Sequence, residues 1–415
     1  MKRKSARESG PRDCDLFKKS LIIIVLIGGV FFFILPDLIG RTMNRVSAAE
    51  SATVDAATQN FHDQLFTADL HADSLLWNRN LHQRGSYGHI DLPRMLDVRH
   101  GLQVFSTVTK TPRFLNFKRN DASSDNITLL AIAQRWPINT WTSLTQRALH
   151  QASRLHRLSA RSNGHFVIVQ SRQDLTDYLA SRKADVAITA GLLAIEGLHA
   201  LEADGDNLRR LYNAGYRMMG LTHFFDNAIG GSAHGIDKGG LTEFGYQTIA
   251  SMERLGIVVD LAHASEQLIT DVLAVATRAV VVSHTGVKGT CDRTRNLSDE
   301  QVRSIASNGG LIGIAFFDEA VCGTEVDSIV IALRYTVNLV GVAHVALGSD
   351  FDGAVTTPFD VTGLPHLTVA LLKSGFSRQE VEAIMGKNIV RLLRQALPKQ
   401  SMDLCSESPL ARDSP

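Results

Sequence analysis

The sequence predicts an α/β protein whose main domain is a (β/α)8 TIM-type barrel. From Phe66 onward, short apolar runs rich in β-branched residues alternate with longer helical patterns, which is typical of βα units around a parallel sheet. A chain of 415 residues is long enough for one such barrel. The eight expected strands are 66–71, 102–108, 192–196, 217–222, 257–263, 279–284, 311–317 and 344–350.

The first forty residues predict a membrane-targeting segment. Residues 1–20 form a basic leader, and residues 21–36 contain no charged side chain. A basic flank before an apolar run places the leader in the cytoplasm and the rest of the chain across the membrane. We therefore expect residues 21–40 to be a single-pass anchor, with the barrel periplasmic or extracellular. The alternative is an exported chain cleaved near Ala48, because Val46, Ser47 and Ala48 resemble a signal-peptide cleavage site.

Three further segments complete the expected organisation: a polar linker at 41–60, the barrel domain at 61–397 and a polar tail at 398–415. A long, mostly helical insertion containing Trp136 and Trp141 is expected between the second and third strands, at 110–190. Lys plus Arg (43) nearly balances Asp plus Glu (42), so we expect no nucleic-acid partner. The sequence leaves the formation of a homodimer open.

Polar side chains close most of the predicted strands, and in such a barrel the carboxyl ends of the strands meet at one face. His71 and Asp73 follow the first strand and point the same way, because residues two apart in an extended segment share a side. Glu196, His263 and His284 end the third, fifth and sixth strands. Three imidazoles and two carboxylates exceed what one catalytic zinc ion needs. They suit two metal ions that share a carboxylate, for which Glu196 is the natural bridge.

Together with further motifs, these residues resemble the membrane dipeptidase (renal dipeptidase) family of zinc peptidases. The resemblance runs from about Thr67 to about Leu393 and rests on motifs in a fixed order. These are His71-Ala-Asp73, Glu196-Gly-Leu, the segments 215–223 and 240–245, Asp260-Leu-Ala-His263, Ser283-His284, Arg295-Asn296 and Gly348-Ser-Asp350-Phe-Asp-Gly353.

The resemblance implies hydrolysis of dipeptides by a hydroxide that bridges two zinc ions per chain. It implies that His71 and Asp73 bind one zinc ion, that His263 and His284 bind the other, and that Glu196 bridges them. All five of these residues are present, whereas a non-catalytic binding barrel, the remaining alternative class, would be expected to lack at least one.

Three further residues receive roles by the same resemblance. His223 would contact the substrate carbonyl, Arg295 its terminal carboxylate, and Asp350 would accept and return protons. An arginine suits the second role because its planar fork matches a carboxylate with two hydrogen bonds.

The sequence departs from the family pattern in the Ser-Leu-Leu that follows Asp73, in the loop after His223 and in the 110–190 insertion. These regions set specificity, so a related amide, β-lactam or lactone stays open as the substrate of the same site.

We also predict a disulfide between Cys291 and Cys322. Both follow consecutive predicted strands and so lie in neighbouring loops at one barrel face, and an exported domain meets oxidising conditions. The similar family places cysteines at comparable points. Cys14 precedes the apolar run and Cys405 lies in the expected tail, so neither is an expected partner.

Overall fold

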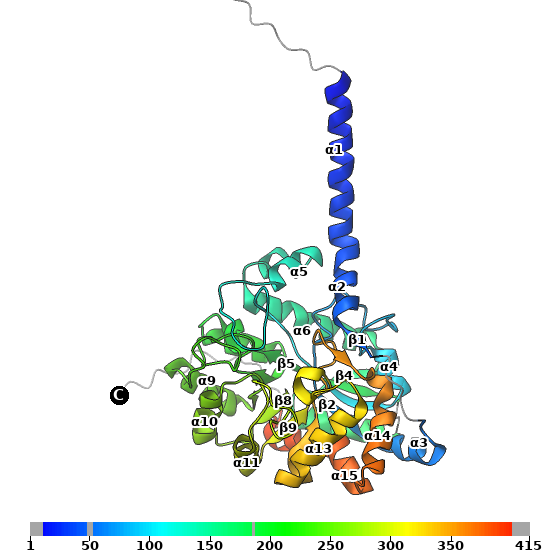
Figure 1. Ribbon diagram of the computed structural model, residues 1–415, viewed down its shortest axis with the longest axis vertical. Coiled ribbons are helices and arrows are strands. Elements are labelled where there is room, and N and C mark those ends of the chain that lie inside the picture. Colours follow the sequence, from blue (N-terminus) through cyan, green and yellow to red (C-terminus); the bar gives the residue numbers. More distant parts are fainter. Residues whose placement is uncertain (1–10, 48–52, 185–186, 401–415) are drawn as a thin grey trace, which may run out of the picture.

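The computed structural model describes residues 11–47, 53–184 and 187–400, and the main body is a parallel barrel (Figure 1). Eight of its strands form a continuous path, and each overlaps one run expected from the sequence. The predicted fold class is therefore confirmed. In spatial order the strands are β2 (Thr67–Ala72), β3 (His100–Phe105), β5 (Thr189–Glu196), β6 (Tyr216–Gly220), β7 (Val258–Asp260), β8 (Val281–Thr285), β9 (Leu311–Ile314) and β10 (Val345–Leu347).

β2 and β10 are the two ends of the strand path, and little backbone pairing joins them at the seam where the barrel closes. A single bridge pairs Ala72 with Phe351, and the amide of Asp73 donates to the carbonyl of Phe351 at 2.8 Å. The buried carboxylate of Asp69 adds two bonds across the seam, accepting from the Ser349 amide at 2.8 Å and from its hydroxyl at 3.0 Å. A side chain thus replaces the missing backbone ladder.

The barrel interior is filled by apolar side chains and closed at one end by α16 (Asn388–Ala396). Every one of the eight strands contributes a buried residue to this cluster, as expected where inward-facing residues alternate along barrel strands. Ile389, Leu392 and Leu393 of α16 belong to the same cluster. The strand residues include Leu70, Leu102, Leu192, Met218, Val258, Val281, Leu311 and Ala346.

Helices surround the barrel, and several begin with a serine or threonine that caps a backbone amide. Thr242, Ser265 and Ser298 accept such bonds at the starts of α9, α10 and α11. The helices that follow the insertion are α8 (Asp206–Asn213), α9 (Glu243–Leu255), α10 (Glu266–Val275), α11 (Asp299–Ser307), α12 (Asp318–Val321), α13 (Val326–Val340), α14 (Leu364–Lys373) and α15 (Arg378–Glu382). Two short helices flank β2, namely α3 (Ala56–His62) and α4 (Leu92–Asp97).

The insertion is mostly helical, as expected, with α5 (Ile127–Ala133), α6 (Leu144–Arg161) and α7 (Arg172–Ala184). It also contains a short strand that the sequence pattern does not predict, β4 (Phe166–Ile168). β4 pairs with the first half of β5, and β6 pairs with the second half along the same edge. Three residues are too few for an alternating pattern to reveal a strand between two helices.

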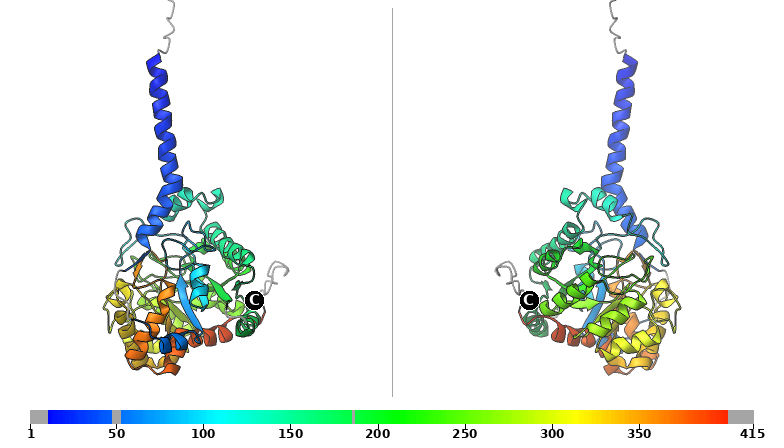
Figure 2. Two further views of the ribbon diagram at one scale, coloured as in Figure 1. Left: turned by 90° about the vertical axis from the view of Figure 1, so that its right-hand side faces the viewer. Right: turned by 90° about the vertical axis from the view of Figure 1, so that its left-hand side faces the viewer.

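A long helix formed by the N-terminal part of the chain projects from the barrel (Figures 1 and 2). It consists of α1 (Pro11–Gly29), a π-helical turn (Val30–Ile34) and α2 (Leu35–Met43). Within the described ranges, the 28 residues Leu16–Met43 form one helix long and apolar enough to cross a membrane, and few of its residues are buried. This fits a signal segment or a single span.

The chain after α2 is built into the domain. β1 (Arg45–Val46) pairs with β11 (Thr356–Thr357), and the Asn44 side chain accepts from the amide of Ala354 at 2.9 Å. The stretch 41–60 expected as a linker therefore holds the end of α2, β1 and part of α3. Ala48, Cys405 and the side chain of Cys14 lie outside the described residues.

The predicted disulfide is confirmed. Cys291 and Cys322 are bonded, with their Cα atoms 5.4 Å apart, and the bond joins the loop after β8 to the end of α12. Asn296 reinforces this link, because its side-chain amide donates to the carbonyls of Cys291 and Ala320 at 2.8 Å each. The loop that carries Arg295 is thereby fixed at both ends.

Replacing both cysteines by alanine should lower the free energy of unfolding by about 3.7 kcal/mol, because the bond closes a loop of 31 residues. Urea unfolding of the oxidised protein and of the double variant measures the difference. Equal midpoints for the two proteins would contradict the expected stabilisation. The reduced wild type is the control and should unfold like the variant.

Candidate metal centre

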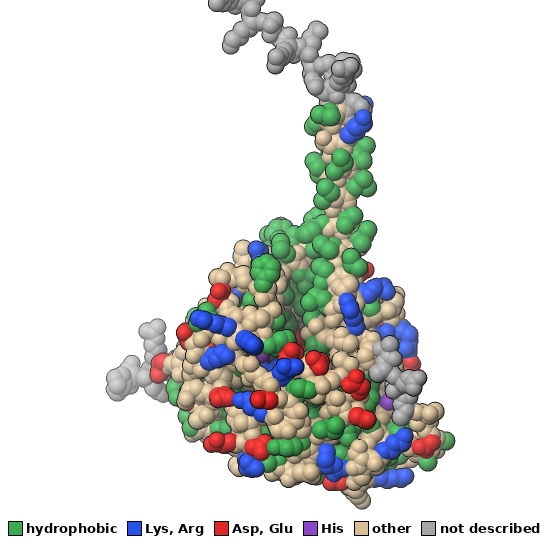
Figure 3. All heavy atoms as spheres, viewed as in Figure 1, with side chains coloured by type: hydrophobic (Ala, Val, Ile, Leu, Met, Phe, Trp, Pro, Cys, Tyr) green, Lys and Arg blue, Asp and Glu red, His purple; other side chains and the backbone are tan. Residues whose placement is uncertain are grey.

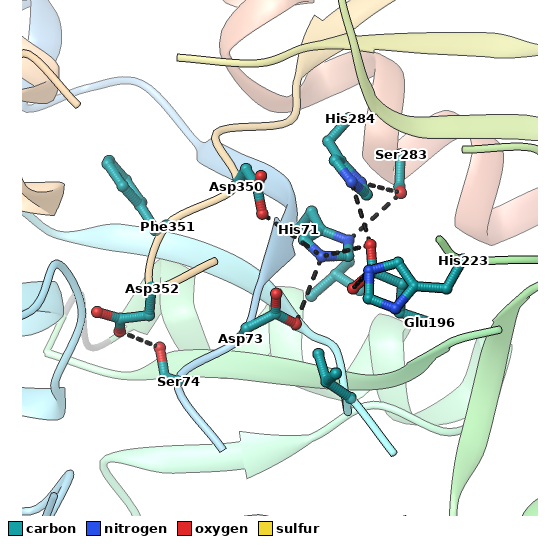
Figure 4. Close-up of polar contacts among 12 residues, drawn as sticks. His71, Asp73, Ser74, Glu196, His223, Ser283, His284, Asp350, Phe351 and Asp352 are labelled. Atoms are coloured by element: carbon teal, nitrogen blue, oxygen red, sulfur yellow. Dashed lines mark hydrogen bonds and ion pairs between the residues drawn. The ribbon is translucent and has the colours of Figure 1, made fainter. Parts of the chain in front are cut away.

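The structure brings together all the side chains that the sequence placed at strand ends (Figure 4). His71 is the second-last residue of β2, Glu196 ends β5 and His284 lies in β8. His223 and His263 follow β6 and β7. All are buried, and Figure 4 shows the side chains of His71, Glu196, His223 and His284 pointing toward one another. The His263 ring lies against Glu196 as well. Asp73, Arg295 and Asp350 line the same cavity as Glu196, His223 and His263.

The carboxylate of Glu196 lies at the centre of the cluster. Its Oε1 is 2.9 Å from Nε2 of His263, 3.2 Å from Nε2 of His284 and 3.8 Å from Nε2 of His71. Its Oε2 is 3.2 Å from Nε2 of His223. Both oxygens therefore face imidazole nitrogens, which is the arrangement that a shared carboxylate requires.

A second group forms around His71. Its Nε2 lies 3.5 Å from Oδ1 of Asp73 and 3.8 Å from Oδ1 of Asp350. Neither this nitrogen nor Oδ1 of Asp73 has a hydrogen-bond partner, although both are buried. Leaving such groups unpaired costs about 1–3 kcal/mol each, so the arrangement calls for a ligand.

The donor atoms fit divalent metal ions. Three sets lie within 4.8 Å of one another: His71 with Asp73 and Glu196, His71 with His284 and Asp350, and Glu196 with His223 and His263. Imidazole nitrogens with carboxylate oxygens suit zinc and similar divalent cations. His223, expected only to contact substrate, thus lies close enough to the cluster to be a ligand as well.

Burial sets the protonation of the histidines. Burial, followed by the nearby charge of Arg295, holds the pKa of His263 well below its usual range, and burial likewise lowers the pKa of His284. Burial also lowers the pKa of His71, but the Asp73 and Glu196 carboxylates outweigh it and raise the value to about 10. A proton on His71 therefore balances charge that a metal ion would otherwise balance.

The carboxyl groups respond in the opposite sense. Burial raises the pKa of Glu196 and holds that of Asp350 well above its usual range. Asp350 and His263 also adopt left-handed backbone conformations, with φ of 61° and 62°. Such conformations are uncommon for residues other than glycine and concentrate at functional sites.

Arg295 lies beside this cluster with part of its guanidinium free. Its Nη2 donates to the carbonyl of His284 at 2.8 Å, and its Cζ lies 5.1 Å from the ring centroid of Phe317. Its buried Nε has no partner. The residue therefore offers a positive, hydrogen-bonding wall to an anion in the cavity.

Two supporting carboxylates were not predicted from the sequence. Asp69 holds the seam, and Asp352 accepts from Ser74, Arg79 and the His89 amide, which ties the loop after β10 to the loop after β2. Asp352 belongs to the Gly348–Gly353 motif, so its place after the last strand could be predicted. Its partners could not, because they lie about 270 residues earlier in the sequence. Ser74 belongs to the Ser-Leu-Leu departure, whose role is thus partly structural.

Comparisons with known proteins agree with this geometry. The sequence model described as membrane dipeptidase (peptidase family M19) matches residues 55–403. Dipeptidase tcpJ of Claviceps purpurea is 29% identical over a stretch that covers 74% of this chain and 69% of tcpJ. The uncharacterized dipeptidase C965.12 of Schizosaccharomyces pombe is 27% identical over 75% of this chain and 73% of its own length. The crystal structure of dipeptidase AC, a metallo peptidase of family M19, superposes with a TM-score of 0.67 at 25% identity over 80% of this chain and 99% of that one.

The likenesses and the buried cluster point to one chemistry. The relatives are named as dipeptidases, and the matching family consists of metallopeptidases, so the chain is a metal-dependent hydrolase of peptide bonds. Its substrates are small peptides. The chain belongs to the membrane dipeptidase family, peptidase family M19.

Proposed function

We propose that this protein hydrolyses dipeptides with two zinc ions. The observation that carries the proposal is the Glu196 carboxylate, whose two oxygens face imidazole nitrogens at 2.9–3.2 Å beside the unpartnered His71 Nε2 and Asp73 Oδ1. Two zinc ions held there would supply an activated water near neutral pH and would polarise the scissile carbonyl.

Five residues would hold the metals. His71 and Asp73 would bind one ion, His263 and His284 the other, and Glu196 both. Burial lowers the pKa values of His263 and His284, so both rings are neutral and have a lone pair to donate, whereas His71 would release its proton on binding a metal ion. Ser283 helps to orient His284, since its hydroxyl lies 2.9 Å from Nδ1.

Three residues would handle the substrate. Burial lowers the pKa of His223 to about 4, so the ring is neutral and can donate one N–H to the carbonyl oxygen as negative charge develops there. Arg295 would hold the terminal carboxylate. Asp350, whose pKa burial raises, suits a group that accepts a proton from water and returns it to the leaving amine.

We further propose that the N-terminal helix is an uncleaved anchor that holds the barrel outside the cytoplasm. Cleavage near Ala48 would remove β1, its pairing with β11 and the bond from Ala354 to Asn44. It would also remove Ile39 and Met43, which line the same cavity as the metal cluster. Retention of the helix keeps this part of the domain intact.

Glu196→Gln should remove the bridging charge, so metal content should fall from about two zinc ions per chain to less than one. We expect the kcat/KM for dipeptides to fall by more than the roughly 10–100-fold that loss of an outer-shell partner causes. Elemental analysis and dipeptide turnover measure the two effects. Glu266→Gln, on the exposed face of α10, is the matched control. Full zinc occupancy with normal turnover in Glu196→Gln would refute the site.

Arg295→Lys should raise the KM for free dipeptides about 10-fold more than the KM for dipeptide amides. Lysine keeps the charge but loses the fork that matches a carboxylate. Steady-state kinetics on paired substrates test this, with the exposed Arg303→Lys as the control. Equal changes for both substrates would mean that Arg295 does not read the carboxylate.

The mature protein should retain its N-terminal helix. Extraction from membranes should then require detergent, and peptide mapping should recover residues before Ala48. Protease added to intact cells or spheroplasts should reach the barrel but not the leader. A mature N-terminus just after Ala48 would instead identify a cleaved signal.

A further inference from the structure

The cavity above the metal cluster continues along the anchor helix. It has a volume of about 520 Å³, with Asp73, Glu196 and Arg295 at its inner end. Figure 3 shows hydrophobic side chains on both sides of a hollow where the helix meets the barrel domain. The anchor is therefore one wall of the cavity that contains the site.

The outer walls of this cavity are apolar. From the helix the lining residues are Phe31, Leu35, Ile39 and Met43, and from α5 they are Ile127, Leu129, Leu130 and Ala133. All eight are hydrophobic, whereas the charged and imidazole side chains of the lining gather at the inner end. A ligand that fills the cavity would thus combine a polar head with an apolar chain.

The cavity is also longer than a dipeptide. Phe31 and Met43 are twelve helical residues apart, which corresponds to about 18 Å along the axis. A dipeptide in extended form spans about 7 Å. A dipeptide bound at the inner end therefore leaves part of the apolar walls without contact.

The outer end of the cavity lies on the candidate membrane span. Phe31 and Leu35 belong to the apolar helix Leu16–Met43. The side chain of Arg135, just after α5, donates to the carbonyl of Phe32 at 2.5 Å and lies 4.4 Å from the ring centroid of Phe33. Nearby Leu129 is 50% exposed and Ile138 is 75% exposed. An anchored domain would therefore present this apolar mouth to the bilayer.

We propose that the same site hydrolyses N-acyl amino acids whose long acyl chain enters from the bilayer and lies between α2 and α5. This inference rests on the proposed function, because it uses the same metal cluster. Water adds across the amide: the C–N bond breaks, the acyl carbon gains the hydroxyl group to give a fatty acid, and the nitrogen gains the proton to give a free amino acid. Arg295 would hold the amino-acid carboxylate as it would for a dipeptide.

The first test uses the full-length zinc-loaded protein in phosphatidylcholine vesicles. N-acylglycines from acetyl to dodecanoyl are compared with glycylglycine, because glycine avoids the question of stereochemistry. We expect kcat/KM to rise about 100-fold from acetylglycine to dodecanoylglycine, well below what full burial of ten methylene groups would give. No hydrolysis of dodecanoylglycine while glycylglycine is cleaved would overturn this inference alone. No hydrolysis of either substrate would also refute the proposed function.

Variants of the wall residues distinguish binding of the acyl chain in the cavity from simple partition of the substrate into the vesicle. Ile39→Glu and Leu130→Glu place a charge in the apolar part and should lower kcat/KM for dodecanoylglycine at least about 10-fold. Activity on glycylglycine should fall less than activity on dodecanoylglycine in both variants, because a dipeptide held at the inner end makes fewer contacts with these walls. Leu38→Glu is the matched control, since Leu38 is 51% exposed on the same helix and is not part of the lining. A loss on dodecanoylglycine that is as large in Leu38→Glu as in the wall variants would overturn the inference.

A second readout needs neither turnover nor mutants. Dodecanoylglycine with a photoreactive diazirine at the end of its chain, mixed rapidly with zinc-loaded wild-type protein and irradiated before turnover, should label peptides containing Leu35 or Leu130. Unlabelled dodecanoylglycine should compete, whereas acetylglycine should not. Labelling confined to the exposed residues of α1, without competition, would overturn the assigned path.

Discussion

The site depends on the closure of the barrel at the Asp69 carboxylate. This buried group accepts from the Ser349 amide and hydroxyl, from the Gln103 side chain at 2.8 Å and from the His71 amide at 3.0 Å. It therefore joins β2, β3 and the end of β10 where the backbone offers a single bridge. The Asp69 carboxylate binds the amide of His71 and also Ser349, the residue before Asp350. The contacts that close the barrel therefore also position His71 and Asp350 in the metal cluster.

The cluster itself opposes folding without a ligand. Buried nitrogens and carboxylate oxygens lie close together, several without partners, and His71 must carry a proton to balance its acidic neighbours. Binding of cations would release that proton and satisfy those atoms, so metal affinity and stability should be coupled. The Asp352 network and the disulfide lie outside the donor set and hold the loops of Asp350 and Arg295 in place independently of the metal.

The sequence was sufficient to predict the fold class and which residues would meet, because barrel topology gathers the carboxyl ends of strands. His71, Glu196, His263 and His284 were found from their places after apolar runs alone. What escaped prediction depended on contacts between distant segments. β4 is too short for a pattern, Asp69 looks like an ordinary strand residue until Ser349 lies beside it, and β1 falls in a stretch that reads as a linker. The proximity of His223 to Glu196 likewise required coordinates.

The position of the anchor helix changes how the cavity is understood. With a flexible linker, the position of the helix would not affect the site. Here β1 and Asn44 fix the end of α2 against the loop after β10, and Arg135, just after α5, binds the π-helical turn that precedes α2. Because α2 supplies apolar side chains to the wall, removal of the helix would open the cavity to water on that side. Water there would weaken the electrostatic interactions at its inner end, since these are strongest where solvent is excluded. The same helix thus contributes both the attachment of the domain and part of the dielectric environment in which the cluster works.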